Sequence, residues 1–496
     1  MNFPSPLLTL RQFAVLLMVS SALHAQTPST TKPAEDAAKG TAPRSIPKIH
    51  ADLCSTCHGV NWEGGRAPSM LDDVWAHGST DADLTRSISE GSPANGMPPF
   101  GPLLTSSEIR GLVILIREAR VKALGVPPAT PPAIADQAVP SELYPLKLEV
   151  VAGGLETPWG MAFLPDGRLL VTERPGRLRL VEPGHGIVGT ISGVPKPWLK
   201  QDGGLFDVAV HPDYAHTGWI YLSYSEPGGT EAGASSTRVI RGRIRDNQLV
   251  DQQTLFQAAP ELYWNSNIHF GSRFRFDRDG FLYFSIGDRG HRDDAQSLAS
   301  PYGKLHRIRD DGSIPADNPF VSRADAVKSV YSYGHRNQQG IAQHPVTGEI
   351  WTAEHGPRGG DELNVIAKGH NYGWPVITYG MNDDGTPITD LTAKEGMEQP
   401  VRYWTPSIAT CALEFYTGDK FPRWKNNLFL TALKGNQLIR LELDGHKIAH
   451  EEVIFRDLGR VRDVVTGPDG YLYLAINTLF ADSPGQIVRL VPARAP

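Results

Sequence analysis

Hydrophobic and polar positions alternate in short runs over most of the chain, and one arrangement of these runs recurs. Each copy has an apolar strand, a tight turn containing Asp with Gly or Pro, and a second alternating strand. The clear copies lie at 160–173, 207–225, 274–288 and 464–477, and weaker ones at 340–356 and 413–433. Six copies, roughly 50 to 75 residues apart, predict an all-β six-bladed propeller over residues 146–496.

The alternative to a propeller is a row of separate β-sandwich domains. No linker-like segment separates the copies, which argues against that arrangement. A propeller brings loops from every blade to one end of a central channel, so polar residues far apart in the sequence can meet at one ligand.

A helical period replaces the alternation in the segment TSSEIRGLVILIREARV. Thr105 and Glu108 form a capping-box pattern at its start. The apolar residues that then share one helical face are Ile109, Leu112, Val113 and Ile116. This pattern predicts the closing helix of a small all-α domain ahead of the propeller.

The N-terminus reads as an export signal. Arg11 precedes the apolar run Phe13–Val19, and small residues follow, so we expect cleavage after Ala25, with Ala22 as the alternative. A signal-anchor helix is the other interpretation, but the apolar run is short for a membrane span. We therefore expect a periplasmic protein that spans no membrane when mature.

Two segments poor in large apolar residues divide the chain further. Residues 26–48 and the Pro-rich residues 125–145 are expected to be linkers, which leaves 49–124 as the small N-terminal domain. At 496 residues the chain has room for two or three domains, and its 50 glycines and 40 prolines favour turns over long helices. Its formal charge of −6, without a basic block, excludes nucleic acid as an expected partner.

Cysteine usage points to a redox group. Cys54, Cys57 and His58 form the motif CSTCH, while Cys411 stands alone. A disulfide and half of a zinc site are alternative interpretations, although zinc would need a second ligand pair that is not evident. The histidine directly after the second cysteine favours covalently attached haem c.

Residues 49–124 resemble a class I cytochrome c domain. That resemblance implies thioether bonds from Cys54 and Cys57 to the porphyrin and His58 as the proximal iron ligand. Met97, in the stiff turn NGMPPFGP, is the expected sixth ligand, with Met70 as a competing candidate. A cytochrome passes single electrons, so another part of the system must supply them.

Polar, Gly-rich stretches interrupt the strand pattern of the propeller. They are NSNIHFGSRFRF with His269, SYGHRNQQG with Arg336 and Asn337, TAEHGPRGGDELN, and GHNYGWP. Lys434 and the pair Arg460 and Arg462 add basic groups late in the chain. Each residue alone has an ordinary explanation as a turn or surface residue, so the combination carries the argument.

From about Leu146 onward the chain resembles the soluble sugar dehydrogenases that depend on pyrroloquinoline quinone (PQQ), most closely their aldose sugar dehydrogenase branch. The matching strings, in order, are GHRNQQG, EHGPRGGDELN, NYGWP, LKGN and RVRDV. The resemblance implies a six-bladed propeller that binds PQQ and calcium.

The resemblance also implies roles for individual residues. PQQ is a flat tricarboxylate, and the cationic groups expected to hold it are Arg336, Lys434, Arg460 and Arg462, with Asn337 at the ring edge. His269 matches the general base that takes the proton of the sugar's anomeric hydroxyl. The residues expected around calcium are Gly356 and Pro357 through their carbonyls, Asp361 supporting that turn, and Glu362 and Tyr372 at a further ion. For Glu362 and Tyr372, an ordinary surface acid and a packing tyrosine remain the alternative.

Two positions depart from the family pattern. The family has a glutamine before its GGLL strand, whereas here Asp202 occupies that place and Gln201 lies one residue away. A carboxylate beside an anionic cofactor is unfavourable unless cations or substrate hydroxyls offset it. The aldose branch also has a tyrosine near the place of Asp383. Both differences bear on the choice of sugar.

The sequence thus predicts a periplasmic quinohaemoprotein that oxidises aldose sugars to lactones. Electrons would pass from PQQ to haem c and then to an external acceptor such as a soluble cytochrome or a quinone. The alternatives are a calcium-dependent propeller lactonase or hydrolase, and a non-catalytic sugar-binding propeller with an electron-transfer domain.

Overall fold

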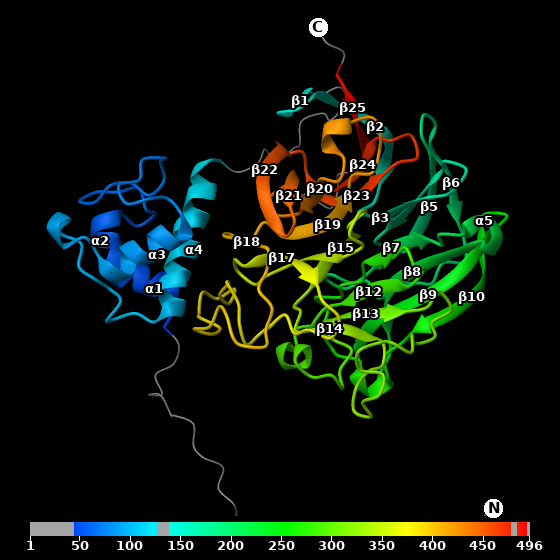
Figure 1. Cartoon of the computed structure of the whole chain (residues 1–496), viewed down its shortest axis with the longest axis horizontal. Helices are drawn as coiled ribbons and strands as arrows, with labels where there is room; N and C mark the ends of the chain where they lie inside the picture. Colours follow the sequence, from blue (N-terminus) through cyan, green and yellow to red (C-terminus); the bar gives the residue numbers. More distant parts are fainter. Residues whose placement is uncertain (1–43, 126–137, 478–483, 494–496) are drawn as a thin grey trace, which may run out of the picture. The chain divides into compact units, whose positions relative to one another are not determined.

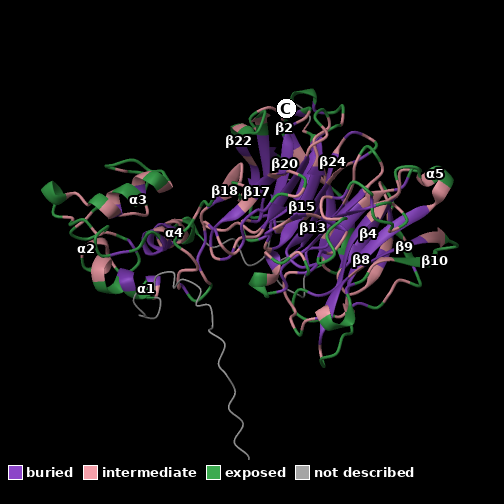
Figure 2. Cartoon of the chain, turned by 60° about the horizontal axis from the view of Figure 1, so that its bottom comes forward, coloured by how far each residue is buried: buried purple, intermediate pink, exposed green. Residues whose placement is uncertain are grey.

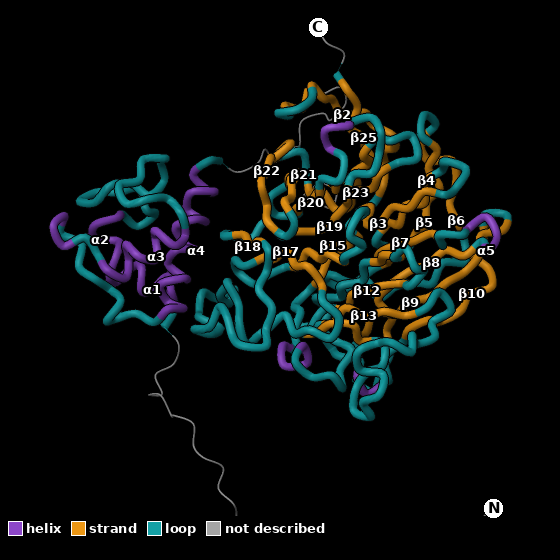
Figure 3. Tube along the Cα trace, in the orientation of Figure 1, coloured by secondary structure: helices purple, strands orange, loops and turns teal. Residues whose placement is uncertain are grey.

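Helical and strand patterning separate along the chain. The structure, a computed structural model, describes residues 44–125, 138–477 and 484–493, so the predicted signal peptide lies outside the described residues. In Figure 3 the helices of the N-terminal segment and the strands of the remainder are drawn in different colours. No helix among the described residues is long and apolar enough to cross a bilayer.

The N-terminal domain consists of helices packed around one apolar cluster. Its helices are α1 (Ile46–Ile49), α2 (Ser55–His58), α3 (Asp81–Glu90) and α4 (Ser106–Ala123), with a π-helical turn at His50–Cys54. Helix α4 begins with the predicted capping box, in which the side chains of Thr105 and Glu108 each accept a hydrogen bond from the other's backbone N–H. Its predicted apolar face is buried in the cluster, so this helix is confirmed.

Six antiparallel sheets form the propeller, and the fold class is confirmed (Figure 1). Each of the six sequence copies supplies the first two strands of one sheet. The first strands of successive sheets contact one another in a ring, so they line the central channel. These six strands are β3 (Pro158–Phe163), β7 (Leu205–Val210), β11 (Phe274–Phe276), β15 (Gln338–Gln343), β19 (Thr410–Phe415) and β23 (Arg460–Thr466).

The second strands are almost fully buried between neighbouring sheets, whereas several outer strands are exposed (Figure 2). The second strands are β4 (Leu169–Glu173), β8 (Trp219–Pro227), β12 (Leu282–Ile286), β16 (Ile350–Glu354), β20 (Leu428–Ala432) and β24 (Leu472–Asn477). The third strands are β5 (Arg177–Glu182), β9 (Ser235–Arg245), β13 (Lys304–Ile308), β17 (Asp361–Ile366) and β21 (Gln437–Asp444). The outermost are β6 (Gly186–Ile191), β10 (Gln248–Phe256), β14 (Val330–Tyr333), β18 (Arg402–Trp404) and β22 (Lys447–Arg456), and the short helix α5 (Tyr214–Thr217) precedes β8.

The sixth sheet is built from both ends of the propeller. Strand β25 (Gly485–Pro492) pairs with β24 on one side and with β2 (Pro145–Leu155) on the other, in a register that places Leu148 opposite Leu490. Strand β1 (Ala138–Pro140) completes the edge, inside the segment predicted as the second linker. The ring is therefore closed by strand pairing between residues about 340 positions apart.

Helix α4 contacts the propeller within the compact unit that begins at Pro43. Ser107 donates from its backbone nitrogen and its hydroxyl to Asp390 Oδ1, at 3.0 and 2.6 Å. Glu118 forms an ion pair with Arg358 at 2.6 Å. Met381, a propeller residue, is buried in the apolar cluster of the helical domain. The loop containing Met381 and Asp390 thus joins the two domains.

A fully buried histidine in β13 predicts acid sensitivity of the fold. Burial lowers the pKa of His306 to about 3, while Ser329 Oγ and the Pro301 carbonyl each lie 2.9 Å from a ring nitrogen. Since the unfolded pKa is about 6.5, the unfolded chain binds the extra proton and stability falls as pH drops below 6.5. We expect His306 to account for a loss of about 2 kcal/mol between pH 7 and pH 5.

Urea unfolding of the wild type and a His306→Gln variant at both pH values measures this loss. Glutamine keeps an amide for the two hydrogen bonds but does not titrate, so the variant should lose about 2 kcal/mol less on acidification. An equal loss in both proteins would contradict the expectation.

Candidate functional site

A cavity of about 890 Å³ opens at the channel, within the size range of small-molecule and cofactor sites. It brings together nine of the residues expected from the sequence. They are Asp202, His269, Arg336, Asn337, Gly356, Pro357, Lys434, Arg460 and Arg462. Arg460 and Arg462 lie at the start of β23, and the other seven lie in loops beside the strands of four further sheets.

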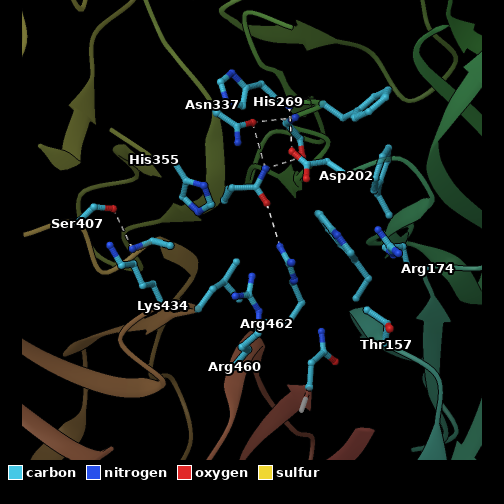
Figure 4. A pocket seen from close by; sticks show the side chains of 18 of the residues that line it. Thr157, Arg174, Asp202, His269, Asn337, His355, Ser407, Lys434, Arg460 and Arg462 are labelled. Carbon is cyan, nitrogen blue, oxygen red and sulfur yellow. Dashed lines mark hydrogen bonds between the residues drawn. The ribbon is translucent and has the colours of Figure 1, made fainter. Parts of the chain in front are cut away.

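Five cationic side chains line this cavity without a carboxylate partner among the described residues. Four of them, Arg336, Lys434, Arg460 and Arg462, were expected from the sequence, and the fifth is Arg174. Burial, and then the charge of Arg462, lower the pKa of Arg460 to about 10, and burial also lowers the pKa of Arg462. In Figure 4, Lys434, Arg460 and Arg462 lie across the cavity from His269 and Asn337. An anionic ligand would relieve this crowding of positive charge.

The imidazole of His269 is hydrogen-bonded to the buried carboxylate of Asp288. Its Nδ1 lies 2.6 Å from Asp288 Oδ1, and the other oxygen of Asp288 accepts a 2.8 Å hydrogen bond from Trp374 Nε1. The carboxylate makes Nδ1 the protonated nitrogen, so Nε2 carries the lone pair. His269 also has a φ of 54°, a backbone conformation that re-aims its side chain at the end of the loop.

The site keeps this imidazole neutral. Burial, then the charge of Arg336, lower the pKa of His269, while Asp288 opposes that change. Burial alone would raise the pKa of Asp288, but the hydrogen bond from His269 and the charges of His269 and Arg336 hold it below its usual value. The pair is therefore a neutral histidine beside an ionised aspartate, the arrangement of a general base with its orienting carboxylate.

Asp202 lies at the cavity, and its neighbour Gln201 does not line it. Asp202 is exposed, and its Oδ2 accepts a 3.4 Å hydrogen bond from the backbone N–H of His269. Asp383 also lines the cavity. Two carboxylates thus face the cavity at the positions where the chain departs from the family pattern.

The turn after β16 is fixed by Asp361 and Arg336. Asp361 accepts hydrogen bonds from the Gly356 and Ile408 N–H groups and from Ser407 Oγ, each at 2.8 Å. The Gly356 carbonyl accepts a 2.8 Å hydrogen bond from Arg336 Nη1. A carbonyl oxygen has a second lone pair, so this one can still face a cation, whereas Asp361 is occupied in supporting the turn.

Glu362 and Tyr372 lie outside the main cavity, beside a separate void of about 10 Å³. Burial and the charge of Glu354 raise the pKa of Glu362 well above its usual value. The Tyr372 hydroxyl donates to the Val365 carbonyl at 2.7 Å, and its ring stacks on His335. In the described part of the chain, no group of three or more His, Cys, Asp or Glu side chains could hold a metal ion. That result concerns side chains only, whereas calcium also takes backbone carbonyl oxygens as ligands.

Several residues of the site were not expected from the sequence, among them Asp288, Trp159 and His355. Asp288 follows Gly287 directly after β12, and a Gly-Asp pair there is a common turn sequence with no sign of a functional role. Trp159 lines the cavity from the inner strand β3, and His355 lines it from the turn directly after β16. For Asp288 and His355 the available signal was that a polar residue after a buried strand lies at the loop end of a blade, and Trp159, inside a strand, gave none.

In the helical domain, two of the predicted haem-binding residues, Cys54 and Met97, border one apolar cluster. Cys54 and Cys57 are free, so the CSTCH motif holds no disulfide. Ser92 and Met97 are paired by two backbone hydrogen bonds, of 2.9 and 3.2 Å, which fix the methionine on a tight hairpin. Gly91, at φ 69°, allows this hairpin, because a Cβ there would lie 2.5 Å from the Pro98 backbone. Met70 borders the same cluster, so both methionines stay candidates.

Both expected prosthetic groups fit the residues that would hold them. At the large cavity, Arg462 Nε and His355 Nε2 are buried without a hydrogen-bond partner among the described residues, beside cations that suit a flat polyanion. In the helical domain, His58 directly follows the two free thiols of Cys54 and Cys57, the spacing of a haem c attachment motif. The donors therefore match a tricarboxylate in the propeller and a thioether-linked haem in the helical domain.

Comparisons with known proteins agree with this division. The family model "Glucose / Sorbosone dehydrogenase" matches residues 155–489, and "Cytochrome C oxidase, cbb3-type, subunit III" matches residues 41–116. The aldose sugar dehydrogenase YliI of Escherichia coli is 42% identical over 353 residues, which cover 70% of this chain and 93% of that protein. Quinoprotein glucose dehydrogenase B of Acinetobacter calcoaceticus is 29% identical, over 66% of this chain and 85% of its own length.

A solved structure supports the same assignment. The PQQ-bound form of the aldose sugar dehydrogenase from Streptomyces coelicolor superposes with a TM-score of 0.56 at 28% identity, covering 71% of this chain and all of that one. The family match extends over more than half of the chain. The protein therefore belongs to the glucose/sorbosone dehydrogenase family and carries a cytochrome c domain ahead of its sugar dehydrogenase propeller.

Proposed function

We propose that this protein is an exported quinohaemoprotein that oxidises aldose sugars to lactones, with PQQ and calcium in the propeller and haem c in the helical domain. An external acceptor, such as a soluble cytochrome or a quinone, would remove the electrons. The observation that carries the proposal is the set of five unpaired cations around one cavity that also holds a neutral histidine. A hydrolytic site for a lactone would not need such a set.

The cations and the turn after β16 would hold the cofactor. Arg336, Arg460 and Arg462 present planar guanidinium groups suited to carboxylates, and Lys434 adds a point charge at the exposed side. Asn337 Oδ1 already accepts hydrogen bonds from Gly271 N and Gln339 Nε2, so its amide NH₂ is the group left to donate. The Gly356 and Pro357 carbonyls would face calcium, which leaves Asp361 as a support.

The chain's own part in the reaction is proton removal. His269 Nε2 would accept the proton of the anomeric hydroxyl, and Asp288 would stabilise the imidazolium that forms. When bound, PQQ supplies the acceptor for the hydride that leaves the sugar carbon. Exclusion of water by Trp159, Phe206 and the surrounding loops would strengthen these charge interactions.

Reconstitution tests the proposal directly. Full-length, haem-loaded protein freed of PQQ should not bleach a dye acceptor with glucose or a panel of other aldoses. Adding PQQ together with Ca²⁺ should restore sugar-dependent bleaching, while either one alone should give much less. Hydrolysis of lactones without PQQ, or sugar binding without any turnover after reconstitution, would overturn the proposal in favour of a hydrolase or a binding protein.

A further inference from the structure

A single buried arginine occupies the centre of the channel, beneath the cavity. Arg273 directly precedes β11, and its side chain is only 4% exposed. None of the roles described so far involves it. Its guanidinium group contacts the first strand of each of the five remaining sheets.

Hydrogen bonds from Arg273 connect it to four of these strands. Nε donates to the Gln339 carbonyl of β15 at 2.8 Å, and Nη1 donates to Asp463 of β23 at 3.0 Å and to Asp207 of β7 at 3.4 Å. Nη2 lies 3.6 Å from Cys411 Sγ of β19. A planar guanidinium with five fixed donors can serve several strands at once, as a lysine ammonium cannot.

The fifth contact is an aromatic one. The guanidinium carbon of Arg273 lies 4.2 Å from the centre of the Trp159 ring, on β3. Trp159 is buried and lines the large cavity. The arginine therefore also fixes the ring that forms part of the cavity floor.

Both carboxylates of this cluster link neighbouring sheets as well. Asp463 Oδ2 accepts a 2.8 Å hydrogen bond from Met161 N, which ties the last sheet to the first. Asp207 Oδ2 accepts one of the same length from Phe274 N, which ties the second sheet to the third. The three charged side chains are thus paired and hydrogen-bonded, as buried charges must be.

The cluster reaches the cofactor-binding cations through Arg462. Arg273 Nη2 donates to the Arg462 carbonyl at 2.5 Å, and Cys411 Sγ donates to the same carbonyl at 3.1 Å. Arg462 Nη1 lies 3.3 Å from the side-chain oxygen Oε1 of Gln339. The backbone carbonyl of Gln339 in turn accepts the hydrogen bond from Arg273 Nε. Arg273, Asp207 and Asp463 also line a second cavity of about 270 Å³. This cavity shares no lining residue with the large one.

We propose that Arg273 is a positioning residue that clamps the six inner strands and thereby sets the floor of the cofactor cavity, through Trp159, Gln339 and Arg462. As a statement about cofactor binding, this inference rests on the proposed function. The clamp itself is a property of the propeller and can be measured without any cofactor.

The test compares Arg273→Lys with Arg440→Lys in the full-length, haem-loaded, PQQ-free protein. Arg440 is the matched control: it is 1% exposed and paired with Glu452 at 2.6 Å, but it lies in β21, away from the channel. Both variants keep the positive charge but lose the planar guanidinium group and its several hydrogen bonds. Both should therefore unfold at a lower temperature than the wild type. Asp463→Asn provides a milder variant should Arg273→Lys fail to fold.

Two measurements distinguish positioning from general stability. In Arg273→Lys, hydrogen–deuterium exchange of peptides covering β15 and β23 should rise at least about tenfold, and PQQ affinity, followed by fluorescence quenching at fixed Ca²⁺, should fall at least about tenfold. Arg440→Lys should change neither. Equal exchange and equal PQQ affinity in the two variants would overturn the inference. If the wild type binds no PQQ, the proposed function fails, and exchange at β15 and β23 alone decides the clamp.

Discussion

Replacing His269 by glutamine is expected to lower sugar turnover by roughly two to four orders of magnitude, the usual contribution of a positioned general base. Glutamine fills similar space but cannot take a proton from the substrate. PQQ affinity should change little, because the cationic groups of the cavity remain. Steady-state dye reduction, together with fluorescence titration of PQQ, measures both quantities on the same preparation.

Asp288→Asn is the companion variant. It keeps the size of the side chain and the contact with Trp374, but it removes the carboxylate that selects the Nδ1-protonated form of His269. The expected loss in turnover is again large, whereas substitution of the exposed Asp384 should have no effect.

Turnover within about threefold of wild type in His269→Gln would show that another group removes the proton.

Loss of the haem should separate sugar oxidation from electron delivery. In a Cys54→Ser/Cys57→Ser variant, sugar-dependent reduction of an external cytochrome is expected to fall at least about a hundredfold, because the tethered carrier acts at high effective concentration. Dye-coupled sugar oxidation should stay within about twofold of wild type. Stopped-flow absorbance with glucose as reductant measures haem reduction in the wild type.

A pair of methionine variants tests the haem site without removing the haem. Met97→Ala should lower the reduction potential and slow electron delivery, because a thioether ligand favours reduced iron. Met70→Ala should leave the potential unchanged, since Met97 alone is fixed on the Ser92 hairpin. A shift confined to the Met70 variant would reassign the sixth ligand, and undiminished cytochrome reduction in the Cys54→Ser/Cys57→Ser variant would exclude the relay.

The blades were predictable because their first two strands are mostly buried and are joined by a recognisable turn. In the first copy, strand β4 is buried along its whole length, and the turn before it contains the expected Asp-Gly pair. Strands β6 and β10 are mostly exposed, so they have no comparable alternation and gave no signal. Strand β2 was hidden for another reason: its partner β25 lies at the far end of the chain, and a Pro-rich stretch precedes it.

The candidate site was predictable through its unusual residue types and through the family resemblance, which supplied the role of each residue. Basic residues and histidines in Gly-rich turns stand out against a strand pattern, so His269 and Arg336 could be named. Asp288 and Arg273 could not, because each sits beside a strand where a polar residue is ordinary. Their importance lies in the partners that the ring closure brings to them, which no local pattern contains.

The way the sixth sheet closes has a consequence for how such a protein can be assembled. Every strand of the ring lies downstream of Ala138, and the electron carrier is attached through a single covalent joint ahead of β1. No blade is interrupted by it. Gene fusion or deletion at that joint would add or remove the haem module while every propeller strand kept its paired strands, and the propeller would lose only surface contacts such as those of Asp390 and Arg358 with helix α4.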